Sequence, residues 1–180
     1  MRNLFILALG LLALIVAQNA QAAEVAENEI ALRLMGGFAF SSNLPASSGP
    51  VLGLEVEAEV VNSFAVGAIF SYAGFDAISP TPDANLAHFA LNPKYVVHKG
   101  SARFSFGAIV GAQIASLHTA SSGAIPASTS STTSLALGVN ANIDIPIWGV
   151  WNLSLSPSFI YGTSSKASQV GLMGGFGFRF

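Results

Sequence analysis

Cysteine, charge and long apolar runs are what this sequence of 180 residues has least of. It contains no cysteine, which excludes a disulfide framework, a thiol nucleophile and a metal site built on cysteine. Charged residues make up 9% of the chain and hydrophobic residues 52%, a balance far from that of a soluble surface. The net charge is −2 and the Lys and Arg residues are scattered, so we expect no nucleic-acid partner.

The longest apolar run lies near the start of the chain. Arg2 precedes an apolar stretch at residues 4–17, and an Ala-Gln-Ala cleavage site ends at Ala22, a combination typical of a signal peptide. The alternative is a membrane anchor, but the stretch is shorter than the roughly 20 residues that a spanning helix needs. We therefore expect a cleaved signal peptide at residues 1–22 and a single exported domain at residues 23–180.

The rest of the chain is hydrophobic in a pattern that does not fit helices. Apolar residues recur at every second position, the period of a β-strand, in eight segments at residues 30–40, 52–60, 64–72, 87–97, 104–114, 135–145, 151–161 and 170–180. A chain in lipid must satisfy its own backbone polar groups, which leaves helices and closed barrels as spanning structures. The sequence predicts an all-β fold: a closed, eight-stranded, antiparallel, up-and-down transmembrane barrel.

The charges of these segments fall on one face only. A soluble β-sandwich also alternates, but a charge that faces lipid near the bilayer centre costs about 2–4 kcal/mol. The uncharged face is therefore expected to meet lipid and the charged face to line the barrel interior. We expect the interior to hold a polar network of nearly balanced acids and bases: Glu29, Arg33, Glu55, Glu57, Glu59, Lys94, Arg103, Asp144 and Arg179.

Three of these acids, Glu55, Glu57 and Glu59, share one face of one segment. One interpretation is a cation site or the acidic lining of a channel. The other is an internal ladder of salt bridges with the basic residues of the same network. We favour the ladder, because buried carboxylates need partners.

Connections between the segments alternate in length. Long connections rich in Ser, Thr, Pro, Gly and Ala are expected at residues 41–51, 74–85, 115–133 and 162–168, and tight ones at residues 62–63, 98–101 and 146–149. Bacterial membrane barrels carry short turns at one end and longer loops at the other. With an even number of strands, this pattern places both chain ends at the turn end.

Two local features predict details of the strand pairing. Pro93 and Pro157 lie inside predicted strands, where a closed barrel has no free edge for a missing N–H, so we expect a bulge or a gap near each. In addition, residues 34–40 nearly repeat as residues 172–178. We expect the first and last strands to pair and close the barrel, with inward glycines that leave room for bulky interior side chains.

The C-terminus carries the most specific motif. Residues 170–180 place apolar residues at every second position and end on phenylalanine, which resembles the C-terminal assembly signal of bacterial outer-membrane proteins. The mature chain is similar to the small eight-stranded barrels of the OmpX, OmpA and OmpW kind. The resemblance implies an outer-membrane location in contact with its lipid, passage through periplasmic chaperones, and recognition by the barrel-assembly machinery of Phe176, Phe178 and Phe180.

Candidate chemistry is sparse in this sequence. His88, His98 and His118 are too scattered to suggest a metal site, and no phosphate loop or nucleophile motif occurs. We therefore expect no cofactor, no metal and no catalytic residues. The expected role is structural or one of surface interaction with an unidentified extracellular partner, in a barrel whose interior is plugged. The alternative is a narrow OmpW-like channel for small or hydrophobic solutes, and a lipid-modifying enzyme is less favoured.

The C-terminal motif generates the first testable prediction. Deletion of Phe180 should lower the amount of barrel in the outer membrane and leave periplasmic aggregates or degradation products, because the assembly machinery would lose its terminal aromatic residue. Membrane fractionation and heat-modifiable gel mobility measure the outcome. Unchanged outer-membrane abundance of a folded barrel would contradict the prediction.

Overall fold

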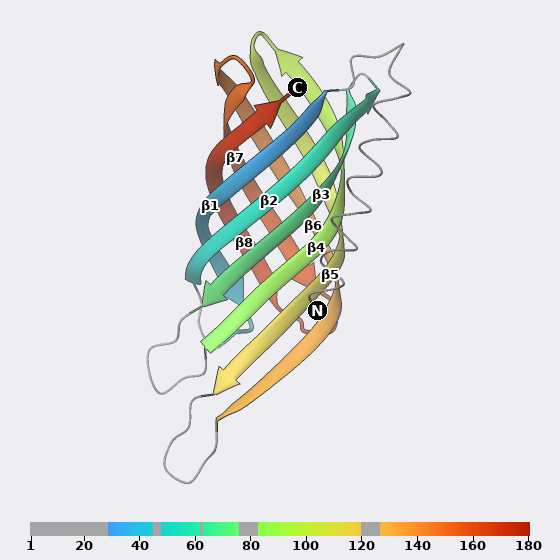
Figure 1. Ribbon diagram of the computed structural model, residues 1–180. Coiled ribbons are helices and arrows are strands. Elements are labelled where there is room, and N and C mark those ends of the chain that lie inside the picture. The colour runs from blue at the N-terminus through green and yellow to red at the C-terminus, as the bar shows by residue number, and fades with distance from the viewer. Residues whose placement is uncertain (1–28, 45–47, 62, 76–82, 120–126) are drawn as a thin grey trace.

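The computed structural model describes residues 29–44, 48–61, 63–75, 83–119 and 127–180, so the expected signal peptide lies outside the described residues. Eight strands form a closed ring in chain order (Figure 1). They are β1 (Ile30–Ser42), β2 (Ser48–Val61), β3 (Phe64–Phe75), β4 (Asp83–Lys99), β5 (Ala102–Thr119), β6 (Ser128–Trp148), β7 (Trp151–Gly162) and β8 (Ser168–Arg179). Every strand pairs antiparallel with its chain neighbours, and β1 pairs with β8, which confirms the predicted eight-stranded barrel.

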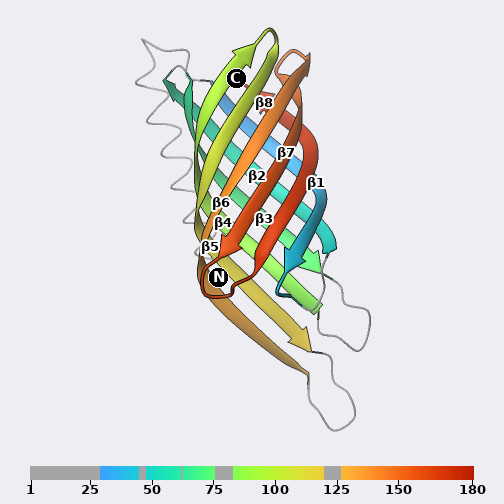
Figure 2. The same cartoon turned by 180° about the vertical axis from the view of Figure 1, so that it is seen from behind.

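The two ends of the barrel differ. The tight connections and the C-terminus lie at the end drawn uppermost in Figure 1, which we call the turn end. At the opposite end, the loop end, β5 and β6 reach beyond the other strands. The view from behind brings β6 and β7 to the front of the wall (Figure 2). Within the described residues, no helix is long and apolar enough to cross a membrane.

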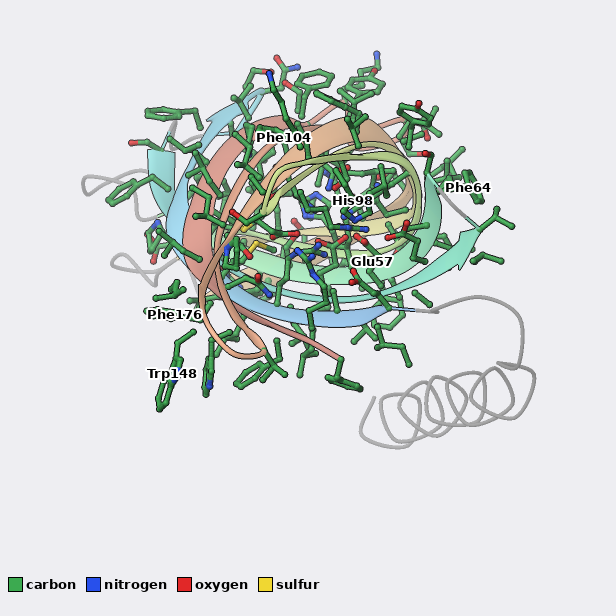
Figure 3. All side chains as sticks on the ribbon, turned by 90° about the horizontal axis from the view of Figure 1, so that it is seen from above. Glu57, Phe64, His98, Phe104, Trp148 and Phe176 are labelled. Carbon is green, nitrogen blue, oxygen red and sulfur yellow. The ribbon has the colours of Figure 1, made fainter. Side chains whose placement is uncertain are left out.

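The alternating pattern sorts side chains to the two faces of the wall. Along β1, Leu34 is 66% exposed, whereas its neighbours Arg33 and Met35 are 1% and 3% exposed. Seen down the barrel axis, Phe64, Trp148 and Phe176 point away from the ring, and Glu57 points into it (Figure 3). The outer face is thus apolar, and polar side chains are enclosed, which is the inverse of a soluble sheet protein.

Several strands are longer than the sequence predicted. The predicted loop at residues 115–133 is largely strand, because β5 continues to Thr119 and β6 begins at Ser128. Cross-strand hydrogen bonds hold this extension, one between the hydroxyls of Ser116 and Ser131 and one between His118 and Thr129, each 3.0 Å long. A segment rich in Ser and Thr is typical of a loop, which is why the sequence predicted one. These side chains nevertheless pair well across strands when the register places them opposite each other.

The tight connection between β4 and β5 is also shorter than predicted. His98 and Lys99 belong to β4, and the turn is reduced to residues 100–101. Gly100 adopts a φ of 63°, a left-handed conformation that costs glycine little and other residues more.

The two prolines that the sequence places inside strands, Pro93 and Pro157, each interrupt a ladder, as predicted. Between β4 and β5 the pairing passes from Leu91 with Val110 to Lys94 with Gly107 in one unchanged register, which leaves Pro93 opposite Ala108 without a ladder bond. The side-chain amide of Asn92 donates to the carbonyl oxygen of Ala108 at 2.8 Å. It thereby replaces the N–H that the proline lacks.

The ladder between β6 and β7 has the second gap. Pairing passes from Asn140 with Ser158 to Ile143 with Leu155, again in one register. Pro157 lies within this gap and keeps its place opposite Leu172 on β8. Both proline effects are therefore local gaps rather than bulges, because the register on either side is the same.

The repeated segments meet where the barrel closes. Residue pairs between β1 and β8 include Met35 with Gly175 and Gly37 with Met173, so each inward methionine stands opposite an inward glycine. A Cβ atom at Gly37 or Gly175 would collide with the backbone of the partner strand. Glycine therefore permits close approach of the two strands, in addition to the side-chain space that the sequence predicted.

The arrangement of the ends generates the second prediction. In a host with an outer membrane, cysteine placed at Ser164, in the exposed connection between β7 and β8, should react on whole cells with a membrane-impermeant thiol reagent. Cysteine at Gly100, in the β4–β5 turn, should react only after the outer membrane is broken. The chain has no cysteine of its own, so the unmodified protein serves as the blank. The reverse labelling pattern would mean that the barrel has the opposite orientation in the membrane.

Candidate functional site: the charged cluster in the barrel interior

Six charged side chains meet inside the turn half of the barrel. We call this set the charged cluster: Arg33 on β1, Glu55 and Glu57 on β2, Lys94 on β4, Arg103 on β5 and Asp144 on β6. Each of these residues is at most 2% exposed. Their inward direction follows from strand parity, since successive side chains alternate between the lipid side and the interior. The sequence predicted all six as interior residues but could not show that they touch.

Arg33 lies at the centre of the charged cluster. Its guanidinium binds Asp144 with two parallel hydrogen bonds, Nε to Oδ1 at 3.0 Å and Nη2 to Oδ2 at 2.6 Å. The remaining terminal nitrogen, Nη1, donates to Glu57 Oε2 at 3.0 Å and lies 3.4 Å from Glu55 Oε2. The paired geometry suits the planar guanidinium and fixes its orientation. Arg33 thereby links β1 and β2 to β6 on another part of the wall.

The other two bases complete the pairing. Lys94 Nζ donates to Glu55 and also to Glu57, the latter at 2.7 Å. Arg103 donates to Glu57 and lies 3.4 Å from Asp144 through Nη1. Three positive and three negative charges therefore alternate within the cluster and cancel. This balance is required, because a buried charge without a partner costs several kcal/mol even after relaxation.

Neutral residues that sequence reasoning did not single out finish the network. Asn142 donates to Glu55 Oε2 at 3.0 Å, and Ser154 donates to Asp144 Oδ1 at 2.7 Å. Both occupy inward positions of their strands and are buried. Parity in the sequence marks them as interior, but only the register of β6 and β7 places them beside these particular carboxylates.

Three members of the predicted network lie outside the charged cluster, toward the turn end. Glu59 Oε2 is 3.6 Å from Arg103 Nε and 3.8 Å from His98 Nε2. Glu29 Oε2 is 3.5 Å from Arg179 Nε, in a pair that is partly exposed. The predicted network therefore divides into a buried centre, which is the charged cluster, and a more exposed rim at the turn end.

The loop half of the interior is mainly apolar, which sequence reasoning missed. Its buried residues include Met35, Val51, Phe75, Leu86 and Met173. Val51 and Phe75 lie in segments that the sequence predicted as connections but that belong to β2 and β3, so the alternating pattern was not extended to them.

A short polar chain accompanies this apolar core. His88 Nδ1 is hydrogen-bonded to Ser71 at 3.1 Å, and His88 Nε2 to Gln113 at 3.0 Å. Ser165, near the loop end, donates to Gln113 Oε1 at 2.6 Å. The inward position of His88 agrees with its strand parity, and its two partners satisfy both ring nitrogens.

A groove lies on the outer wall at the ladder gap beside Pro157. The groove has a volume of about 600 Å³ and is lined mainly by apolar atoms of four strands, with Phe106, Ala108, Ala141, Pro157 and Phe159 among its residues. Beneath it the interior is filled, since a Cβ atom on Gly107 would lie within 3.0 Å of the side chains of Asn92, Lys94 and Asn140. The groove therefore ends at the packed interior.

Solved structures of bacterial outer-membrane proteins resemble the whole described barrel. Neisserial surface protein A is 17% identical, with a TM-score of 0.65 over 84% of this chain and 97% of that one. The chain has the fold of the small eight-stranded outer-membrane barrels. Ail of Yersinia pestis, solved with the heparin analogue sucrose octasulfate, is 18% identical, with a TM-score of 0.62 over 86% and 100% of the two chains.

Another bacterium supplies a comparable match. A major outer-membrane protein from Thermus thermophilus is 13% identical, with a TM-score of 0.67 over 86% of this chain and 100% of that one. No family model matches the sequence, and no curated protein is significantly similar to it. Identities this low show the common fold only. Any role of the barrel interior must be argued from the residues described above.

The balance of the charged cluster generates the third prediction. Glu57→Gln keeps the shape of the side chain but leaves three buried cations facing two carboxylates, so the free energy of unfolding should fall by about 3–5 kcal/mol. Urea unfolding of the refolded barrel in lipid vesicles, followed by tryptophan fluorescence, measures the change. Glu29→Gln is the matched control in the partly exposed pair and should cost less than about 1 kcal/mol. Equal effects of the two substitutions would show that the cluster contributes no special stability.

Proposed function

We propose that the protein is an integral outer-membrane barrel with a structural or surface-interaction role, and that its charged cluster closes the interior to ions. The fold and the apolar outer wall support the membrane location. The single observation that carries the closed interior is the set of direct bonds that Arg33 makes across the barrel.

These bonds leave little space for a column of water. Eight strands enclose an interior that side chains can fill. Here Arg33 on β1 reaches Asp144 on β6, Lys94 on β4 reaches Glu55 on β2, and Asn142 on β6 also reaches Glu55. Contacts that cross the ring in several directions close it at one level. An ion would have to separate paired charges in order to pass.

The loop half supplies a second barrier of a different kind. Its core of Met35, Phe75, Leu86 and Met173 is apolar and carries no charge, so an ion that entered from the loop end would lose most of its hydration for the few polar groups of the His88 chain. The two halves together support a plug over most of the barrel length.

A surface role would be carried by the loop end. The extended β5–β6 hairpin presents exposed Ser and Thr residues over Ser128–Thr133. Among the Lys and Arg residues of the sequence, Lys166 alone belongs to the connections of the loop end. A polyanion such as the heparin analogue bound to Ail would therefore find little positive charge. Partner binding at this end would depend on hydrogen bonds from hydroxyls and backbone groups.

A narrow channel that opens sideways is the second candidate. The groove at Pro157 supports it, because a proline gap is where the wall is weakest and where a hydrophobic solute could leave the barrel. The filled interior beneath Gly107 opposes it, and we rank it second for that reason.

An enzymatic role has less support. Ser71 and His88 form a hydrogen-bonded pair of the kind found in hydrolases, but the two residues are 2% and 1% exposed. The third member of their chain is Gln113, which lacks the charge that orients a catalytic histidine. A substrate acyl group could not reach the serine oxygen.

Conductance decides between the plug and the channel, which is the fourth prediction. The purified, refolded barrel in planar lipid bilayers should give no steady current, because the charged cluster blocks the path. Glu57→Gln should produce flickering openings by freeing a cationic partner, whereas Glu29→Gln should remain silent. Stable, reproducible channels from the unmodified protein would refute the plug and support the channel.

A further inference from the structure

Three potential metal ligands converge at the turn end, outside the charged cluster. Glu29 directly precedes β1, Glu59 lies near the end of β2, and His98 near the end of β4. One ligand atom from each lies within 4.8 Å of the other two. A backbone bond from the Glu59 N–H to the Glu29 carbonyl, 2.9 Å long, holds the two glutamates opposite each other. Figure 3 shows His98 inside the ring at the near end.

The Glu59 carboxylate supplies a second, independent observation. The residue is 8% exposed, and its Oε2 atom is buried without a hydrogen-bond donor. The nearest cationic group, Arg103, lies 3.6 Å away and already serves Glu57 and Asp144. A buried carboxylate oxygen without a donor is costly to maintain. This oxygen is directed at His98 Nε2, 3.8 Å away.

Charge balance points in the same direction. The charged cluster cancels within itself, and Glu29 pairs with Arg179. Glu59 is therefore the one surplus negative charge among the predicted network residues, which include five acids and four bases. A positive ion at this position would balance it, whereas the neighbouring imidazole does so only when protonated.

The chemistry of the donors selects the kind of ion. Two carboxylate oxygens with one imidazole nitrogen are a donor set typical of Zn²⁺, which bonds such atoms at about 2.0–2.2 Å. Ca²⁺ and Mg²⁺ prefer sites built from oxygen alone. We infer that Glu29, Glu59 and His98 form a binding site for a divalent transition-metal ion of the Zn²⁺ type, with water as a further ligand.

The site has the freedom and the space that this requires. Ligand atoms up to 4.8 Å apart must draw closer around an ion, and two of the three side chains can move, since Glu29 and His98 are 40% and 47% exposed. A cavity of about 260 Å³ adjoins the site, lined by Glu29, Asn152 and Arg179 among others. It offers room for water beside Glu29. The inference does not depend on whether the barrel interior conducts.

Calorimetric titration of the metal-free, refolded barrel with ZnCl₂ tests the inference. The unmodified protein should bind one equivalent in a saturable manner. His98→Ala should weaken binding by more than the roughly 10- to 100-fold that loss of an outer-shell partner costs. His118→Ala is the matched control, because His118 lies at the loop end bonded to Thr129, and should bind as the unmodified protein does. CaCl₂ and MgCl₂ should not compete.

A second measurement separates binding from folding. Zn²⁺ should raise the thermal unfolding midpoint of the unmodified barrel and of His118→Ala, because an ion that binds only the folded state stabilises it. It should leave the midpoint of His98→Ala unchanged. Glu59→Gln should behave like His98→Ala, and His98→Ala alone decides the outcome if Glu59→Gln does not fold.

Two results would overturn the inference. Absence of Zn²⁺ binding to the unmodified barrel would mean that His98 meets Glu59 as a simple ion pair or through water. Binding that is equally strong in His98→Ala would place the metal elsewhere on the chain.

Discussion

The hydrogen-bonded ring that β1 closes with β8 is the constraint on which the rest of this protein depends. In lipid, each backbone N–H and C=O needs a partner within the chain, and closure removes the two edges that an open sheet would leave unpaired. Eight strands then enclose a space about one layer of side chains wide. Whatever points inward must therefore fit against, and pair with, what points inward from the opposite wall.

The interior meets this requirement in two different ways. In the turn half, Arg33, Lys94 and Arg103 are matched by three carboxylates, and the attraction offsets the cost of removing six charges from water. In the loop half, Met35 and Met173 occupy the space opposite the glycines of the neighbouring strand. The first solution gives directional bonds across the barrel, and the second gives apolar packing.

Within the described residues, the regular barrel is interrupted at Pro93 and Pro157 and by register shifts near Val61 and Pro146. Pro93 removes one ladder donor, and the amide of Asn92 supplies another to the same region. Pro157 coincides with the apolar groove on the outer wall. At the turn end, Glu59 retains an acceptor without a donor. The regular part of the fold supports a location in a membrane. The irregular positions at Pro157 and Glu59 are those on which the proposed channel and the proposed metal site rest.

Strand number, the inward and outward faces, an irregularity at Pro93 and at Pro157, and the pairing of the first and last strands could all be predicted from the sequence. They could be predicted because alternation with period two, proline chemistry and a local repeat are properties of neighbouring residues. The ends of β5 and β6 could not, since their Ser and Thr residues form strands only when a partner strand faces them. The same holds for the contacts of the interior. Arg33 and Asp144 are 111 positions apart, and only the shear and closure of the barrel bring them, or Glu29, Glu59 and His98, within reach of one another.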